Sequence, residues 1–128
     1  MEISKIAKAM AKQRPNFLVD GTIVDVTKWA RPVGLTFPCF LDKSLWETRI
    51  KGASGEPPEN QETRLTELLE AAARAAAQTR DVIADVNFFI SGGLVSGEGL
   101  AYLVCGPFSS VDPSPTFTIV DAAEFPRE

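Results

Sequence analysis

The chain contains no histidine, and it has only two cysteines among its 128 residues. The lack of histidine excludes Ser-His-Asp and Cys-His catalysis, histidine-ligated zinc and a histidine proton shuttle. Two cysteines are too few for a four-cysteine zinc site or a four-cysteine iron–sulfur cluster. We therefore expect neither a metal site nor a cofactor.

Long hydrophobic runs are also missing. No stretch approaches the roughly 18 apolar residues that a membrane span needs, and no apolar signal-peptide core follows the basic residues of 1–14. We therefore expect a cytoplasmic protein that does not enter a membrane. Cys39 and Cys105 lie in apolar, strand-like sequence, which predicts two buried thiols; a reactive thiol is the alternative.

The residues that are present have the balance of a globular domain. Apolar residues make up 45% of the chain and charged residues 23%, and the formal net charge is −4. A chain of this length buries roughly two-thirds of its unfolded surface, so we expect one domain over 1–128. The charge is uneven, with +4 on residues 1–51 and −8 on residues 52–128. This polarity either steers the chain toward a partner of complementary charge or reflects two ordinary solvated faces.

The first half predicts short elements. An apolar stripe that includes Ile3 and Met10 predicts a basic amphipathic helix over 1–14, which Pro15 ends; its stripe is narrow, so it either packs loosely or docks on a partner. Residues 22–26 predict a strand and 27–30 a short helix. Residues 35–41 predict a second strand, which Pro38 makes an edge strand or a distorted one. Asp42 or Ser44 then caps a short helical turn.

The second half predicts a long helix followed by strands. Glycine, serine and two prolines make 51–60 a loop. The helical period then runs over about 60–80, with Asn60 as its N-cap. Residues 86–90, 100–105 and 116–120 predict three strands, and their short connections indicate an antiparallel meander. Because a sheet face must be covered, the long helix is expected to pack on it, which gives a single α+β domain.

Two patterns invite a catalytic interpretation, and each has an ordinary alternative. The glycine-rich segment 92–97 lacks the lysine and the hydroxyl residue of a phosphate-binding loop, so we expect a hairpin connection. Asp81 and Asp85 are spaced to share a helix face, where they are either an acid–base pair or ordinary solvated side chains at a helix end. Asp20 and Asp25 are the other carboxylates considered for such a pair. No metal site is expected from them.

Two groups of residues are candidates for a protein interface. Lys28, Trp29 and Arg31 combine the residue types enriched at interface hot spots, although tryptophan is also a common core anchor, which is what we expect of Trp46. The acidic candidates begin within the predicted loop and continue into the long helix; they are Glu56, Glu59, Glu62, Glu67 and Glu70.

Direct nucleic-acid binding is not expected. The one basic patch predicted lies on the first helix and consists of Lys5, Lys8, Lys12 and Arg14, whereas the pI of the chain is about 4.9. An acidic surface can instead occupy the basic groove of a nucleic-acid-binding effector complex. We expect a protein partner of that kind.

The order of several short motifs carries a family resemblance. These motifs lie at 20–27, 30–31, 34–38, 45–46, 64–65, 104–107 and 116–119. Together they resemble an uncharacterised bacterial family, domain of unknown function 6573, met mostly on plasmids, phages and other mobile elements. The chain departs from it at Thr66, where the family often has an aromatic residue, and the helix over 1–14 looks like an addition. The family has no assigned catalytic residues, so the resemblance implies a genomic setting only.

These observations predict a non-enzymatic protein-binding protein of a mobile element, in its most concrete form an inhibitor of a host defence complex of the anti-CRISPR kind. One alternative is a small enzyme that depends on carboxylates such as Asp25, or on Cys105. The other is a structural homodimerisation module that uses the helix over 2–13, so monomer and homodimer both stay open.

Overall fold

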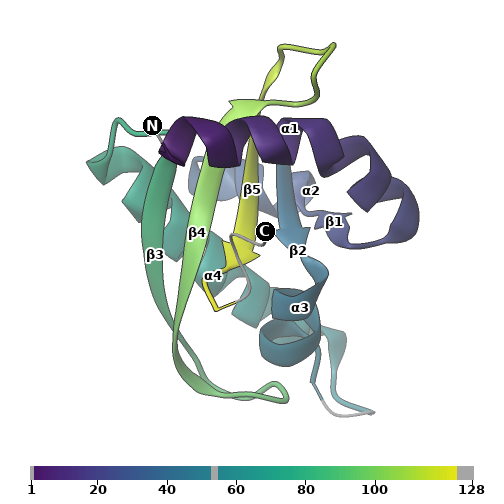
Figure 1. Cartoon of the computed structure of the whole chain (residues 1–128). Helices are drawn as coiled ribbons and strands as arrows, with labels where there is room; N and C mark the ends of the chain where they lie inside the picture. The colour runs from purple at the N-terminus through teal and green to yellow at the C-terminus, as the bar shows by residue number, and fades with distance from the viewer. Residues whose placement is uncertain (1, 53–54, 124–128) are drawn as a thin grey trace.

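A computed structural model describes residues 2–52 and 55–123, with side chains from residue 5 onward. The chain begins with α1 (Glu2–Asp20), β1 (Ile23–Asp25), α2 (Thr27–Ala30), the 3-10 turn η1 (Arg31–Val33) and β2 (Cys39–Asp42). There follow α3 (Lys43–Leu45), the π-helical turn η2 (Trp46–Ile50), α4 (Pro58–Gln78), β3 (Ile83–Ile90), β4 (Gly97–Pro107) and β5 (Pro115–Asp121). The predicted α+β class is confirmed (Figure 1).

The five strands form one sheet in the order β1-β2-β5-β4-β3. The predicted meander is confirmed, because β3 pairs antiparallel with β4 and β4 pairs antiparallel with β5. Strands β1 and β2 are also antiparallel. The β2–β5 pair is parallel, with Leu41 opposite Ile119, and it makes the sheet mixed rather than wholly antiparallel as expected. This pair joins the two halves of the chain.

The main core lies between one face of the sheet and α4, as predicted for the long helix. Leu65, Leu68 and Leu69 of α4 are fully buried against sheet residues such as Val86 and Ile119. Full burial of a leucine side chain stabilises the fold by about 1.5–3 kcal/mol. Trp29 and Trp46 pack against this cluster while staying partly exposed.

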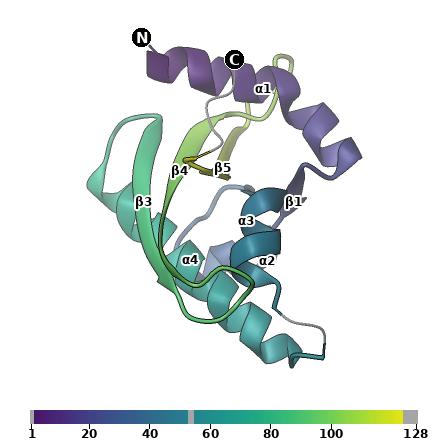
Figure 2. The ribbon, with the colours of Figure 1, turned by 60° about the horizontal axis from the view of Figure 1, so that its bottom comes forward.

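Helix α1 covers the other face of the sheet. Ala7 and Met10 form a second core cluster with Val104 and Val120, and Phe17 packs against it. Figure 2 shows α1 and α4 on opposite sides of the sheet. The stripe of α1 is therefore used inside the protein, with the side chain of Ile3 lying outside the described part.

Three predicted boundaries were wrong. Helix α1 continues through Pro15 to Asp20, because residues beyond the proline, Phe17 among them, still pack on the sheet. Strand β2 begins at Cys39, so Pro38 precedes it, and β2 lies inside the sheet rather than at its edge. Helix α4 begins at Pro58 with Pro57 in the cap position, so Asn60 lies within its first turn. A proline is well tolerated in the first turn, where a helix N–H has no partner.

The predictions for the helix cap at Asp42 and for the 92–97 hairpin are confirmed, whereas the predicted pair of Asp81 and Asp85 is wrong. Asp42 caps α3 as expected, because its Oδ1 accepts a hydrogen bond from the Ser44 N–H at 3.1 Å. The 92–97 segment connects two antiparallel strands, as a hairpin loop does. Asp85 lies in β3, so it cannot share a helix face with Asp81. Part of the predicted 51–60 loop, residues 53–54, lies outside the described part of the chain.

Candidate functional site

The acidic candidates of α4 lie on the exposed side of that helix. Glu59, Glu62, Glu67 and Glu70 are all exposed, whereas the opposite side of α4 is locked into the main core. No ion pair involves any of the four within residues 2–52 and 55–123. From Glu59 to Glu70 the helix advances about 16 Å, at 1.5 Å per residue. We call these four residues the acidic helix face.

Glu56 does not belong to this face. Its carboxylate pairs with the Arg64 guanidinium, and both side chains are largely buried. Arg64 also donates from Nε to the carbonyl oxygen of Ile50 at 2.9 Å. The pair therefore fastens the start of α4 to the end of η2, which indicates a structural role.

The basic candidates form a compact turn beside α4. Lys28 and Arg31 are exposed, and the Lys28 Nζ lies 5.6 Å from the centroid of the Trp29 ring, within cation–π range. Ala30 is fully buried and anchors the turn in the core. We call Lys28, Trp29 and Arg31 the basic turn.

The fold brings the basic turn and one end of the acidic helix face to the same side of the molecule. A shallow hollow of about 500 Å³ lies between η1 and α4, and its lining includes Pro32 and Val33 next to Glu70 and Arg74. Helix α2 also packs on α4. Pro32 and Val33, which directly follow the basic turn, therefore lie beside Glu70, about forty positions later in the sequence.

Asp25, a candidate for carboxylate chemistry, has a structural role that the sequence did not reveal. Its Oδ1 accepts hydrogen bonds from the backbone N–H of Thr27 at 2.9 Å and from the Thr27 hydroxyl at 2.6 Å. The same hydroxyl accepts a hydrogen bond from the Cys39 N–H at 3.0 Å. Asp25 thus orients the side chain that ties α2 to β2.

Replacing Asp25 with alanine is expected to lower the free energy of unfolding by about 1 kcal/mol, because one side-chain acceptor of this network is lost. Asp25→Asn keeps an oxygen acceptor and should unfold close to the wild type in urea. If Asp25→Asn destabilised the chain as much as Asp25→Ala, the carboxylate charge itself would be required and the explanation by a hydrogen-bond acceptor alone would be wrong.

Both cysteines lie in environments that favour the neutral thiol. Cys39 is fully buried, and burial together with the nearby Asp25 carboxylate raises its pKa to about 12. Burial also raises the pKa of Cys105, although the Arg14 guanidinium opposes this. Because the thiolate is the nucleophilic form, neither residue is activated for covalent chemistry.

Arg14 was expected on an exposed basic patch, and this prediction was wrong. Its side chain is fully buried, and Nε and Nη2 donate to the Thr118 hydroxyl at 3.2 and 2.9 Å. Its Nη1 donates to the carbonyl oxygens of Pro107 and Phe108 at 2.6 and 2.8 Å. Burial lowers the pKa of Arg14 to about 10. The exposed basic residues of α1 that remain are Lys5, Lys8 and Lys12.

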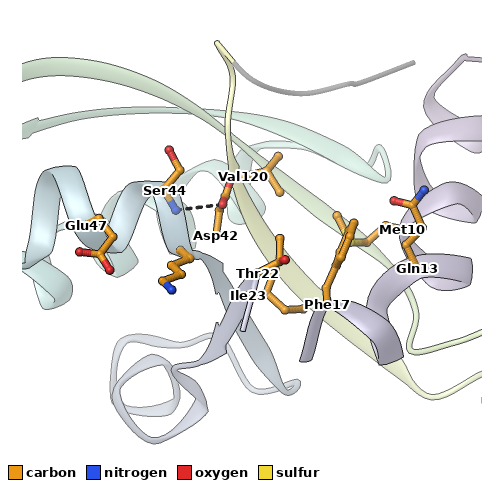
Figure 3. A pocket seen from close by; sticks show the side chains of 10 residues that line it. Met10, Gln13, Phe17, Thr22, Ile23, Asp42, Ser44, Glu47 and Val120 are labelled. Atoms are coloured by element: carbon orange, nitrogen blue, oxygen red, sulfur yellow. Dashed lines mark hydrogen bonds between the residues drawn. The ribbon is translucent and has the colours of Figure 1, made fainter. Parts of the chain in front are cut away.

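A deeper cavity lies under the second half of α1, where no candidate was predicted (Figure 3). It has a volume of about 570 Å³, and its apolar lining includes Phe17, Ile23 and Val120. Its two carboxylates have partners within the protein: Asp42 accepts from backbone N–H groups, and Glu47 pairs with Lys51 at 3.6 Å. The cavity therefore has an apolar interior but no free charge aimed into it from these two residues.

Among the residues the structure describes, no group of three or more histidine, cysteine or carboxylate side chains is placed to hold a metal ion. The same part of the chain has no helix that is both long and apolar enough to cross a bilayer.

No family model, curated protein or solved structure matches the chain. The resemblance to domain of unknown function 6573 therefore stays a prediction that rests on the order of its motifs.

Proposed function

We propose that this chain is a non-enzymatic protein-binding protein, and that it binds its partner through the acidic helix face and the adjoining basic turn. The observation that carries the proposal concerns four exposed carboxylates on a helix whose other side packs in the core: none of them forms an ion pair with another residue that the structure describes. The backbone of such a helix is already ordered, so only the glutamate side chains have to be ordered on binding.

The charge pattern indicates the chemistry of the partner. A row of carboxylates attracts a basic surface and accelerates encounter with it. Basic grooves of this kind are typical of proteins that bind nucleic-acid backbones. We therefore propose a nucleic-acid-binding protein as the partner, and inhibition of a host defence complex by a mobile element as the biological setting.

The local chemistry of the alternative catalytic residues supports a binding role. Asp20 and Asp25 each hold a turn together through a hydrogen bond to the threonine two positions later. Both thiols are held in the protonated form by burial. Asp20 and Asp25 therefore have structural roles, and neither thiol is an activated nucleophile.

The proposal predicts that Glu67→Lys/Glu70→Lys weakens capture of the partner by about tenfold or more, because two attractive contacts become repulsive. Wild-type chain is immobilised, bacterial lysate is passed over it, and the retained proteins are quantified by mass spectrometry. A double-stranded oligonucleotide in the wash should release the partner, since both compete for its basic groove.

The matched control is Asp81→Lys/Glu98→Lys, which changes the net charge equally at exposed positions away from the acidic helix face. This control should capture the partner as the wild type does. Equal capture by both double variants, or retention of no nucleic-acid-binding protein by the wild type, would overturn the proposal.

A further inference from the structure

Strand β3 forms one edge of the sheet, with no strand beyond it in either view (Figures 1 and 2). Its register with β4 and the hydrogen bond from the Cys105 N–H to the Val82 carbonyl fix which backbone groups face β4. In an antiparallel ladder these are the groups of every second residue, which here are the even-numbered ones. The odd-numbered residues therefore direct their N–H and C=O groups outward; they are Ile83, Asp85, Asn87 and Phe89.

This edge has no partner in the described part of the chain. Within residues 2–52 and 55–123, no hydrogen bond reaches the outward backbone groups of these four residues. The other edge strand, β1, has only three residues, whereas β3 has eight. A long edge with a free row of donors and acceptors is a template for pairing with another strand.

The usual devices that block such pairing are missing from β3. The segment Ile83–Ile90 contains no proline, lysine or arginine, and its register with β4 runs without a bulge. Its single charge is Asp85, and Phe89 is 63% exposed on the face that α1 does not fully cover. Natural edge strands are protected by those devices, so their absence here indicates that the edge is used.

We propose that β3 pairs antiparallel with β3 of a second copy of this chain, which extends the sheet from five strands to ten across a two-fold axis at Val86. In this register each outward residue finds an outward partner. Ile83 lies opposite Phe89 of the second copy, and Asp85 lies opposite Asn87 of the second copy. The symmetry repeats both pairs, and all eight outward backbone groups of each copy are hydrogen-bonded.

The side chains of this register complement each other, which is the reason to assign the edge to a second copy. A β-branched residue against an aromatic residue is a favourable cross-strand pair, and an Asn amide can donate to the opposing Asp carboxylate. No like charges lie directly opposite. On the α4 side, the edge faces an open hollow of about 310 Å³ whose lining includes Ala75, Ile83 and Asp85.

The direct test combines light scattering with hydrogen exchange on the full chain over a range of concentrations. The mass should rise from that of the 13.9 kDa monomer to twice that value. Over the same range, the outward amides of Asp85, Asn87 and Phe89 should become protected. A monomeric mass at every concentration, or a dimer that leaves these amides unprotected, would overturn the proposal.

Two substitutions at one position test the register. Asn87→Lys places a lysine opposite Asp85 of the second copy, twice per dimer, and should tighten dimerisation by about 2- to 30-fold. Asn87→Asp places two carboxylates opposite each other and should weaken it by a similar factor. If Asn87→Lys weakened the dimer instead, the axis would pass through Asn87 and the proposed register would be wrong.

Neither substitution should disturb the monomer, because the Asn87 side chain is exposed and its backbone groups do not face β4. Circular dichroism of both variants at low concentration provides this check. No residue of the acidic helix face lines either of the two hollows at this edge, so Glu67→Lys/Glu70→Lys should leave the dimer intact. A failed partner capture and a failed dimer are thereby distinguishable.

Discussion

Replacing Arg14 with leucine is expected to lower the free energy of unfolding by about 3 kcal/mol, because one buried and two partly buried oxygen atoms lose their donor. A buried acceptor left without a partner costs roughly 1–3 kcal/mol, and a partly buried one costs less. The atoms concerned are the Thr118 hydroxyl and the carbonyl oxygens of Pro107 and Phe108. Leucine fills part of the vacated volume but offers no hydrogen bond. Urea denaturation followed by circular dichroism measures the loss.

Two further variants separate this network from a simple loss of charge. Lys12→Leu removes one positive charge from an exposed position of the same helix and should change stability by less than about 0.5 kcal/mol. Arg14→Lys keeps the charge but cannot reproduce the planar fork of donors, so it should fall between wild type and Arg14→Leu. Wild-type stability of Arg14→Leu would show that the buried guanidinium contributes nothing.

Replacing Gly99 with alanine is the second substitution with a large expected effect, a loss of about 2 kcal/mol from overpacking. Gly99 lies directly opposite Phe88, and a Cβ atom at Gly99 would fall 2.5 Å from the Phe88 ring. It would also lie 3.1 Å from the Arg49 guanidinium, which stacks on that ring at 5.3 Å and donates to the Gly97 carbonyl oxygen. The ring cannot move without disturbing this stack.

The matched control is Gly106→Ala in the same strand. A Cβ atom there would meet only the Ala7 methyl group, at an ordinary 3.4 Å. Gly106→Ala should therefore lie within about 1 kcal/mol of the wild type, and the smaller unfolded ensemble of alanine favours a gain. Thermal denaturation of both variants gives the comparison. If Gly99→Ala melted at the same temperature as Gly106→Ala, the Phe88 ring would accommodate the new methyl group at position 99 without cost.

The elements of the second half were predictable from the sequence because their signals are local. Each signal lies within a short stretch of sequence. One is the helical period around Leu65, Leu68 and Leu69, and the other is the β-branched or aromatic runs before and after Gly97. Their short connections fix the meander as well. The parallel β2–β5 pair was not predictable in this way, since it joins residues about eighty positions apart and no local pattern encodes that pairing.

The prediction that Pro15 ends the first helix failed for a physical reason. Pro15 disfavours helix at Arg14, but the packing of Phe17 and the hydrogen bonds of Arg14 outweigh this preference. If the apolar stripe of the helix is continued past Pro15, Arg14 lies on that stripe, four residues after Met10. This position was the signal in the sequence that could have predicted the burial of Arg14. The candidate interface residues were proposed from their residue types alone. The contact between η1 and α4 that brings the two groups near each other is a tertiary contact, which residue type does not predict.

The last strand of the chain, β5, occupies the centre of the sheet, between β2 and β4. While the protein is being synthesised, the β1–β2 pair and the β3–β4 pair consequently lack the strand that joins them into one sheet until residue 119 has left the ribosome. Until then contacts through helices such as α1 and α4 link the two pairs. Pairings between distant segments of sequence form slowly and expose apolar surface in the meantime. A nascent chain stalled before Pro115 should remain sensitive to protease, whereas a chain with β5 outside the ribosome should become resistant.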